Sequence, residues 1–546
     1  MSAVVAKTLK PVGSRRPEPR RPQSLQAIRP TAWLLSLISG VLQVVIFPLP
    51  NWTFLCWIAV APLLIAVLSA RRGPQGLMPA TAWQAAALAY PNGLIFHIGT
   101  CYWVANVMKN YGKLSTPLAM GVMVLMCMVL ALSHAAFGLL VALAAGWRGL
   151  GTRALLLAPL FWVPLELSRQ YAFGFLWNPI GTVLVDNIPL SRIATVTGVW
   201  GLSFEILLVN TVFAAAFLGR RDRRIPVLAG TILLCGLLET GAYFQPAKSA
   251  ASGTARLVQA DIPIKDTGWS YEYFQNTLAD LTRLSVPHPG EGMAGDPQPD
   301  LIIWPETPSP FFDNDPRFRG VLSQVARDAH GYVIAGTLGV LRGEQNTERV
   351  SNSASLVAPN GDWVARYSKV RLVPFGEYVP FKFVFGFAHK LTKEVGDFVP
   401  GTERMALPVH SYKLGIFICY ESVYPNEIRQ FADNGANLLV NISNDGWFGH
   451  TAAPEQHLRQ ARMRSVENHR WLLRSTNTGI TASIDPYGRV VAQARRDSRL
   501  AIDVPYGVET GTTLYTRYGD WFPYLCAIIS LGMLFLRPAF RRKVVN

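Results

Sequence analysis

Residues 413–425, with the sequence KLGIFICYESVYP, carry a cysteine at the end of a short apolar run. The run at 414–418 is rich in β-branched and aromatic side chains, so it predicts a buried strand that ends at Cys419. Residues 426–434 follow with a helical pattern. Backbone N–H groups at such a strand-to-helix junction can stabilise a thiolate and an oxyanion. Cys419 is therefore a candidate nucleophile, although a lone cysteine is more often a buried structural residue.

Two further stretches supply the groups that a nucleophilic thiol needs. The sequence LIIWPETP at 301–308 carries Glu306 at the tip of a predicted strand, and YSKVRLVPFGEYVP at 367–380 carries Lys369 and Glu377. A thiol needs a base to remove its proton, and an oxyanion needs a positive charge beside it. Glu306 can be the base and Lys369 the cation. Each residue alone is more often a solvated surface group, so the hypothesis depends on the combination.

In the order Glu306, Lys369, Cys419, these residues resemble the catalytic triad of the nitrilase superfamily. The strings YSKVRLVPFGEYVP, CYES at 419–422 and SNDGWFG at 443–449 are similar to those of one membrane-bound branch, the apolipoprotein N-acyltransferase family. Together with the apolar segments, this resemblance covers nearly the whole chain. It implies a nitrilase-like α-β-β-α sandwich for the polar segment.

The composition is that of a membrane protein. Of the 546 residues, 50% are hydrophobic and only 16% are charged, which is too apolar for an ordinary soluble enzyme. The formal charge of +16 sits largely in short clusters of arginine and lysine between apolar stretches. This pattern follows the positive-inside rule, so we expect a membrane partner and no nucleic acid.

The apolar stretches predict a polytopic α-helical membrane domain of about eight transmembrane helices, each near the ~20 residues that cross a bilayer. They lie at 31–47, 52–70, 80–104, 117–146, 154–171, 192–218, 225–244 and 521–537. Basic clusters fall on every second boundary, at 71–72, 148–153, 220–224 and 541–543. A buried core helix is the alternative for any one stretch, but it does not explain this alternation of charge.

The charge pattern also predicts the topology and the domain organisation. Residues 1–30 form a disordered basic cytoplasmic tail, and residues 31–244 form a transmembrane domain of about seven helices. Residues 245–518 form the catalytic domain, in the periplasm of a bacterial inner-membrane protein. Residues 519–546 add the last transmembrane helix and a basic tail. Both termini are expected in the cytoplasm.

Strand-like and helix-like runs alternate within 245–518, which indicates a mixed α+β and α/β fold. Strands are expected near 255–262, 300–304, 331–340, 353–358, 414–419, 437–442 and 480–484. Helices are expected near 271–285, 316–329, 425–434 and 455–471. The turn sequences at 360–361 and 486–488 predict that part of the sheet pairs through hairpins.

Some charged residues lie inside the apolar stretches. Glu166 and Arg169 are three residues apart, so they share a helix face and can pair. Glu205 and Glu239 have no evident partner in the sequence, and we expect structural roles for them.

The positions of the cysteines and histidines indicate which kinds of site the chain can form. Cys419 is alone in the polar segment, because the other cysteines, at positions 56, 101, 127, 235 and 526, lie in or beside apolar stretches. An exported domain with one cysteine cannot form an internal disulfide, which favours a chemical role for that thiol. His450, His457 and His469 are not at zinc-ligand spacing, so neither a metal nor a cofactor is expected.

These residue types suit acyl transfer through a covalent intermediate. Glu306 removes the proton of Cys419, and the thiolate attacks an ester carbonyl. Lys369 and the backbone N–H of Tyr420 stabilise the oxyanion. An amine then attacks the resulting thioester. Glu377 is expected to orient Lys369 or Glu306 by hydrogen bonding.

The resemblance implies further site residues. Tyr420 and Glu421 flank the nucleophile, and Trp269 follows a Q-x-N-I-P-like stretch at 259–263. Trp177 ends the aromatic loop FGFLW at 173–177, which we expect at the outer membrane interface, where it can help exclude water from the thioester.

The resemblance also implies the substrates. The acyl donor is a phospholipid, and the acceptor is the N-terminal amine of a diacylglyceryl-cysteine on an apolipoprotein; a monomer is expected. Two alternatives stay open: a membrane-tethered nitrilase-type amidase that hydrolyses a small amide, and a transporter or scaffold whose nitrilase-like domain only binds. The amidase needs no large membrane portion, and a binding module does not need Glu306, Lys369 and Cys419 together.

Overall fold

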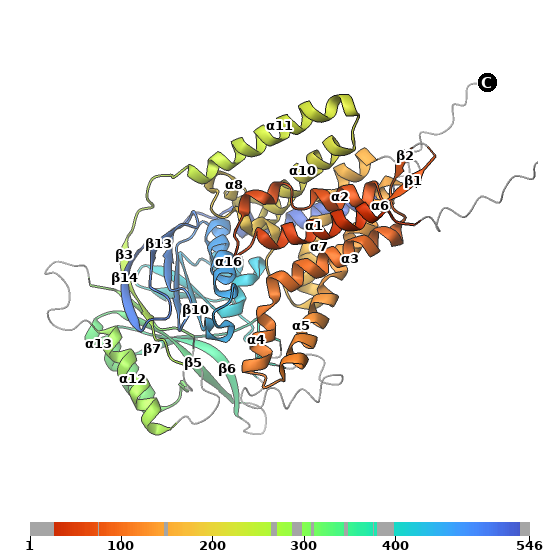
Figure 1. The fold of residues 1–546 in the computed structure, drawn as a ribbon. Helices are drawn as coiled ribbons and strands as arrows, with labels where there is room; N and C mark the ends of the chain where they lie inside the picture. Colours follow the sequence, from red (N-terminus) through yellow and green to blue (C-terminus); the bar gives the residue numbers. More distant parts are fainter. Residues whose placement is uncertain are drawn as a thin grey trace, which may run out of the picture.

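A bundle of helices from the first half of the chain stands beside a pair of stacked sheets (Figure 1). The computed structural model describes residues 27–74, 76–146, 151–263, 270–286, 298–306, 311–342, 348–374, 376–378 and 398–535. Most of the predicted basic tail at 1–30, and the end of the chain after residue 535, lie outside these ranges.

The helical part is built mainly from the segment expected to cross the membrane. Its longer helices are α1 (Pro30–Val45), α2 (Ala61–Leu68), α3 (Ala82–Cys101), α4 (Trp103–Asn110), α5 (Thr116–Leu130), α6 (Leu132–Ala145), α7 (Gly151–Phe173), α10 (Val199–Leu218) and α11 (Arg221–Glu239). Short elements join them: η2 (Thr53–Trp57), a β1–β2 hairpin (Arg71–Gly73 and Gly76–Met78), η3 (Ile180–Leu184), α8 (Ile188–Ser191), α9 (Ala194–Thr197) and η4 (Thr240–Tyr243). After the sheets, α17 (Leu514–Tyr518) leads into α18 (Trp521–Phe535), which packs on α7.

Three helices among the described residues are long and apolar enough to cross a membrane: Thr116–Ala145, Val199–Leu218 and Asp222–Tyr243. The apolar helices Pro30–Val45, Thr53–Leu68 and Trp521–Phe535 are shorter. By length and composition, fewer helices in the described part of the chain can cross a membrane than the eight or so that the sequence predicts. Helix α7, for example, is long enough but contains the charged residues Arg153, Glu166 and Arg169.

Two mixed six-stranded sheets form the second part of the molecule. The strands of one are β3 (Gly253–Gln259), β4 (Leu301–Ile303), β5 (Tyr332–Arg342), β6 (Glu348–Val357), β7 (Trp363–Ser368) and β14 (Leu500–Tyr506), in the order β14-β3-β4-β5-β6-β7. Those of the other are β8 (Ala406–Val409), β9 (Tyr412–Ile418), β10 (Leu438–Ser443), β11 (Leu472–Thr476), β12 (Ala482–Ile484) and β13 (Val490–Gln493), in the order β13-β12-β11-β10-β9-β8. Strands β3, β4 and β5 run parallel, as do β9, β10 and β11.

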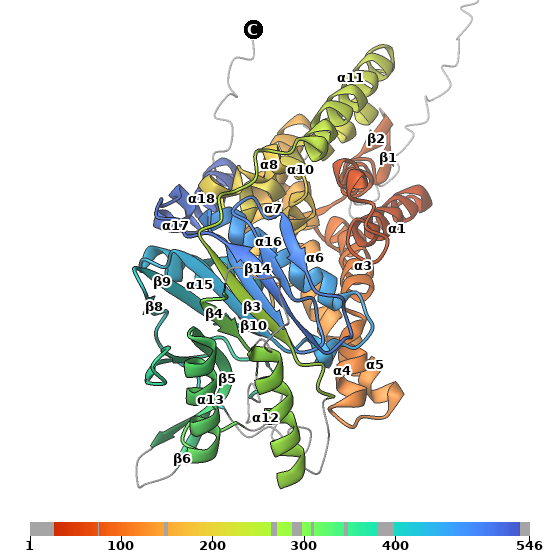
Figure 2. The same cartoon turned by 90° about the vertical axis from the view of Figure 1, so that its left-hand side faces the viewer.

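The sheets pack face to face, and helices cover the outside of each. Helices α12 (Tyr271–Ser285) and α13 (Pro316–Ala329) lie on the first sheet, while α15 (Pro425–Asp433) and α16 (Ala453–Asn468) lie on the second (Figure 2). Leucine, isoleucine and valine from both sheets are buried together between them. This is the four-layer α-β-β-α arrangement that the sequence resemblance predicts.

Most of the sequence-based predictions for this part are confirmed. Each expected strand and helix is present within a few residues, and both turn sequences join antiparallel strands, β6 to β7 and β12 to β13. Strands β8, β11 and β14 lie outside the predicted runs, and β7 and β13 are indicated only by the turn sequences before them. β11 was hidden because the helical pattern was extended to residue 471, whereas α16 ends at Asn468 and His469 adopts a left-handed φ of 49°.

Helix α16 also faces the helical part, so it joins the two halves of the molecule. The backbone N–H of Val199 donates to Glu467 (3.0 Å), and the N–H of Ala452 donates to the hydroxyl of Tyr102 (3.0 Å). The indole N–H of Trp177 donates to Gln456 at 2.7 Å. The side of the sheets that α16 covers is therefore turned toward the helical part.

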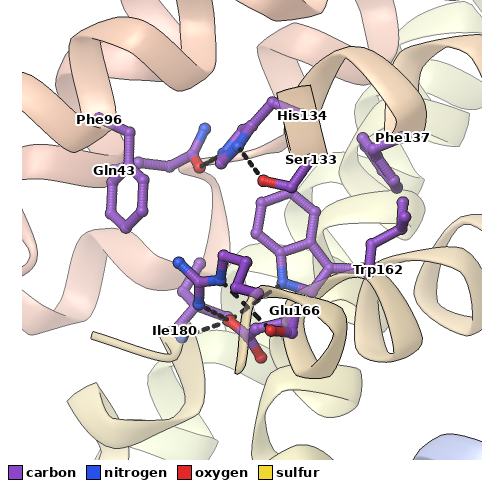
Figure 3. A pocket seen from close by; sticks show the side chains of 10 residues that line it. Gln43, Phe96, Ser133, His134, Phe137, Trp162, Glu166 and Ile180 are labelled. Carbon is purple, nitrogen blue, oxygen red and sulfur yellow. Dashed lines mark hydrogen bonds and ion pairs between the residues drawn. The ribbon is translucent and has the colours of Figure 1, made fainter. Parts of the chain in front are cut away.

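The predicted pair of Glu166 and Arg169 is present at 3.6 Å, and both side chains are buried. Glu166 also accepts hydrogen bonds from the hydroxyl of Ser203 (2.6 Å) and from the backbone N–H of Ile180 (2.7 Å). The pair borders a cavity of about 20 Å³ that His134 also lines (Figure 3). A cavity of this size holds about one water molecule. Glu166 thus ties α7 to α10 and to the turn that follows residue 177.

The remaining two membrane-segment glutamates differ from each other. The prediction that Glu239 lacks a partner is wrong, because its carboxylate accepts from the indole N–H of Trp57 at 2.5 Å. Sequence distance hid this contact, since the two residues are 182 positions apart. One carboxylate oxygen of Glu205 is buried without a hydrogen-bond partner among the described residues.

Candidate functional site

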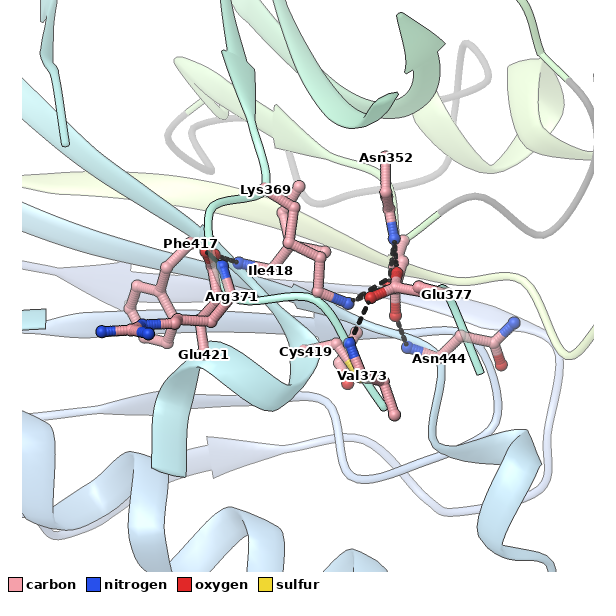
Figure 4. Close-up of polar contacts among 12 residues, drawn as sticks. Asn352, Lys369, Arg371, Val373, Glu377, Phe417, Ile418, Cys419, Glu421 and Asn444 are labelled. Atoms are coloured by element: carbon pink, nitrogen blue, oxygen red, sulfur yellow. Dashed lines mark hydrogen bonds and ion pairs between the residues drawn. The ribbon is translucent and has the colours of Figure 1, made fainter. Parts of the chain in front are cut away.

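The fold brings Glu306, Lys369 and Cys419 to one place through the ends of three strands. Glu306 follows β4, Lys369 comes directly after β7, and Cys419 comes directly after β9. In α/β folds the carboxyl ends of strands are where functional side chains gather. Although they are widely spaced in sequence, Lys369 lies beside Cys419 (Figure 4), and its ammonium contacts Glu306.

Lys369 is the centre of this cluster. Its side chain is 1% exposed, and its ammonium donates to Glu306 at 3.2 Å and to Glu377 at 2.9 Å. Burial alone would lower the pKa of Lys369, but the charges of Glu306 and Glu377 outweigh burial and hold this pKa above its usual value. The ammonium is therefore a fixed positive charge.

Backbone and amide donors orient both carboxylates. The side-chain amide of Asn352, on β6, donates to Glu306 (2.8 Å) and to Glu377 (2.7 Å). The backbone N–H of Asn444 donates to the other oxygen of Glu306 at 2.9 Å, and that of Val373 donates to Glu377 at 2.8 Å. Glu377 thus contacts Lys369 directly and reaches Glu306 only through shared donors.

Cys419 sits on a sharp turn between β9 and η7 (Cys419–Val423). Its φ of 50° lies in the left-handed region, which side chains other than glycine rarely adopt. Such backbone strain persists only where the surroundings impose it, and it is typical of nucleophiles presented at a strand-to-helix turn. The residue is 5% exposed and lies beside the Lys369 and Glu377 side chains (Figure 4).

The electrostatic surroundings of Cys419 keep its thiol protonated at rest. Burial and the negative charge of Glu306 raise the pKa of Cys419, while the positive charge of Lys369 lowers it by less. The net pKa lies above that of an ordinary thiol. A thiol in this state reacts as a nucleophile only when a base removes its proton, and the Glu306 carboxylate is close enough to act on the pKa of Cys419.

Glu421, predicted as a site residue from the resemblance, lies two residues after Cys419 in η7. Its carboxylate accepts from the backbone N–H groups of Ile418 and Val370, both at 2.7 Å, and from the hydroxyl of Tyr367 at 2.7 Å. Burial raises the pKa of Glu421, and the hydrogen bonds from Ile418 and Tyr367 oppose the rise. Glu421 therefore fixes the end of β9 to the segment that carries Lys369.

Tyr420 and Trp177 bring the helical part to the site. Their rings stack with centroids 6.3 Å apart and planes at 15°. The hydroxyl groups of Tyr420 and Tyr424 donate to the carbonyl of Gly174 at 3.3 and 2.7 Å. The aromatic loop predicted at 173–177 thus lies against the turn that holds Cys419. Trp269, the remaining predicted site residue, lies outside the described residues.

Sequence reasoning missed several residues around the cluster. Asn352 has no motif that distinguishes it from other asparagines in strands. Asn444 and Asp445 lie in the string SNDGWFG. That string carries the family resemblance but does not indicate a role for either residue. The spacing of His457 excludes a zinc site but does not predict that its ring is buried against Asp445 and the backbone of Cys419.

The raised pKa of Cys419 predicts slow, alkali-dependent alkylation. An ordinary thiol is half ionised near pH 8.5, so iodoacetamide labelling of Cys419 should still rise steeply between pH 8 and pH 10. Lys369→Met should slow labelling at pH 8.5, because removing the ammonium raises the pKa further. Mass spectrometry of the Cys419 peptide measures the rate, with N-acetylcysteine as the internal reference. A plateau at or below about pH 8 would contradict the assignment.

Two family models match the chain. The model described as carbon-nitrogen hydrolase matches residues 254–505, and the model described as apolipoprotein N-acyltransferase N-terminal domain matches residues 39–212. The first range contains the two sheets and the Glu306, Lys369 and Cys419 cluster. The second contains most of the helical part and the 173–177 loop.

Some solved structures also match about half of the chain at low sequence identity. An amidase from Nesterenkonia sp. is 20% identical, with 48% of this chain and 93% of that chain covered and a TM-score of 0.34. A carbon-nitrogen hydrolase from Helicobacter pylori G27 is 18% identical, with 46% and 88% covered and a TM-score of 0.34.

Curated relatives match over almost the full length. The apolipoprotein N-acyltransferase of Geobacter metallireducens is 35% identical, with 96% of this chain and 98% of the relative covered. That of Methylococcus capsulatus is 34% identical, with 93% and 96% covered, and that of Thermotoga maritima is 30% identical, with 92% and 93% covered. Since both halves of the chain match in this way, it belongs to the apolipoprotein N-acyltransferase family of the nitrilase superfamily.

Proposed function

We propose that the chain transfers an acyl chain from a phospholipid, through a thioester on Cys419, to the N-terminal amine of a diacylglyceryl-cysteine on an apolipoprotein. Membership of the family supports lipoprotein N-acylation. The observation that carries the mechanism is the buried ammonium of Lys369, paired with Glu306 and Glu377 beside a thiol on a strained turn.

The first half-reaction forms the thioester. Glu306 accepts the thiol proton as the sulfur of Cys419 bonds to the ester carbonyl carbon. Negative charge then develops on the carbonyl oxygen, and Lys369 stabilises it together with the backbone N–H of Tyr420. The carbon–oxygen bond of the ester breaks, and the departing glycerol oxygen takes the proton from Glu306. The product that leaves is a lysophospholipid.

The second half-reaction moves the acyl chain to nitrogen. The amine of the lipoprotein attacks the thioester carbonyl, and Glu306 accepts a proton from the amine. The carbon–sulfur bond breaks, and the sulfur of Cys419 regains that proton. Because the first product leaves before the second substrate arrives, the kinetics are of the ping-pong type. Throughout both steps Glu377 and Asn352 hold Lys369 and Glu306 in place.

The substrates fit the position of the site. Both carry long acyl chains that stay in a bilayer, and apolar helices stand next to the sheets on the side where Trp177 stacks on Tyr420. Cys419 is 5% exposed, which favours retention of the thioester until the amine arrives. A membrane-tethered amidase would need neither this helical part nor exclusion of water. A transporter or scaffold would not need a buried, oriented Glu306, Lys369 and Cys419.

We also propose a multi-pass topology in the bacterial inner membrane, with about eight spans, both termini in the cytoplasm and residues 245–518 in the periplasm. The alternating basic clusters support this arrangement.

Reporter fusions test the topology. A reporter that is active only in the periplasm should work when fused near residue 250 or residue 515 and should be inactive after Asn546. The reason is that an even number of spans returns the C-terminus to the side of the N-terminus. Activity of the fusion after Asn546 would contradict the even number of spans.

Single-turnover transfer tests the reaction itself. Full-length protein with labelled phospholipid alone should release one equivalent of lysophospholipid and then stop, because the thioester waits for an amine. Addition of a diacylglyceryl-cysteinyl peptide should then move the label to the peptide. Cys419→Ala should do neither, and Glu306→Gln should acylate slowly because the thiol lacks its base, by about 10²–10⁴-fold. Steady release of free fatty acid without peptide, or peptide acylation by Cys419→Ala, would contradict acyl transfer.

A further inference from the structure

A fully buried histidine contacts the backbone of the nucleophile. His457 lies on α16, and its side chain is 0% exposed. Its Nε2 lies 3.0 Å from the backbone carbonyl oxygen of Cys419, and its Nδ1 lies 2.9 Å from a carboxylate oxygen of Asp445. The mechanism above makes no use of this ring.

The partners of the ring determine which nitrogen carries hydrogen. A carbonyl oxygen only accepts hydrogen bonds, so Nε2 must be protonated to bond the oxygen of Cys419. Nδ1 faces both the Asp445 carboxylate and a guanidinium nitrogen of Arg474, at 3.1 Å. Whether Nδ1 donates to Asp445 or accepts from Arg474, the donation from Nε2 is retained.

The ring is held from every side. Asp445 accepts from the hydroxyl of Ser443 (2.8 Å) and from Arg474 (2.7 Å), and both Asp445 and Arg474 are fully buried. Trp177 stacks on the imidazole with centroids 5.7 Å apart, and Phe448 meets it edge-on at 5.9 Å. A ring clamped in this way keeps one orientation, so its hydrogen bond to Cys419 has a fixed direction.

The bonded carbonyl belongs to a peptide group with two functions. The C=O of Cys419 and the N–H of Tyr420 lie in one planar unit, and in a trans peptide they point in opposite directions. Fixing the oxygen of Cys419 therefore also fixes where the N–H of Tyr420 points. A hydrogen bond to the carbonyl additionally polarises the unit and makes that N–H a stronger donor.

We propose that His457 is a positioning residue that clamps the Cys419–Tyr420 peptide, so that the left-handed turn presents the thiol while the Tyr420 N–H points at the oxyanion. This inference rests on the proposed role of Cys419 as nucleophile. His457 transfers no proton in the reaction. It fixes the orientation of the Cys419–Tyr420 peptide. Without this hydrogen bond, Cys419, whose φ is 50°, relaxes toward a commoner backbone conformation, and the thiol and the Tyr420 N–H turn away from the substrate carbonyl.

Two isosteric amides test the clamp. In His457→Gln the side-chain nitrogen takes the place of Nε2 and can still donate to the carbonyl of Cys419, whereas in His457→Asn it reaches only toward Asp445. We expect His457→Asn to slow acylation of Cys419 by labelled phospholipid about 10–100-fold, the size expected when reacting groups are misplaced by about 1 Å. His457→Gln should recover most of this loss. His450→Gln, at a side chain that is 84% exposed, is the matched control and should acylate normally.

The readouts separate positioning from other roles. The phospholipid concentration at half-maximal rate should stay unchanged in His457→Asn, because the clamp acts on the reacting groups. The pH profile of acylation in His457→Gln should match the wild type, since no proton passes through the ring. If His457→Asn does not fold, the pH profile of His457→Gln still tests the proposal. A displaced profile would show that His457 acts as an acid or base and would overturn the proposal.

The outcomes also separate this inference from the proposed function. If the wild type forms no acyl adduct on Cys419, the proposed function fails and the inference fails with it. If the wild type forms the adduct and His457→Asn forms it at the same rate, only the inference is overturned. Equal losses in His457→Gln and His457→Asn would also overturn it, because the restored donor would then have no effect.

Discussion

One buried ammonium, that of Lys369, holds two carboxylates close together where little water can screen their charges. The carboxylates of Glu306 and Glu377 accept hydrogen bonds from the same side-chain amide, that of Asn352. Without the ammonium between them, their charges would repel each other. Burial and the negative charge of Glu306 keep the pKa of Cys419 above its usual value, and the positive charge of Lys369 opposes them only in part. Pairs that are buried this deeply tolerate little change, because removing one partner leaves an uncompensated charge.

A second constraint links this cluster to the helical part. Helix α16 contributes Gln456 to the indole of Trp177 and, one residue later, His457 to the backbone of Cys419. Trp177 in turn stacks on both His457 and Tyr420. The turn at Cys419 is therefore packed between a sheet and a loop from the apolar segment. The order of the site depends on contact between the two halves of the molecule.

The sequence predicted the strands that end at Glu306 and Cys419, because each is a short apolar run closed by a turn. It also predicted the pairing of Glu166 with Arg169, since a spacing of three residues defines a helix face. It could not predict contacts between residues far apart in the chain, such as Asn352 with both glutamates or Glu239 with Trp57. It also could not show that His457 bonds a backbone carbonyl, because such a contact leaves no residue pattern.

The proposed mechanism requires that Cys419 carries the acyl chain. Intact-mass and peptide mass spectrometry of full-length protein purified from membranes measures this most directly. We expect a mass increment of one fatty acyl group on the peptide that contains Cys419. Hydroxylamine should remove this group, because it cleaves thioesters. An acyl group on any of the other five cysteines, or an unmodified Cys419 after incubation with phospholipid, would contradict it.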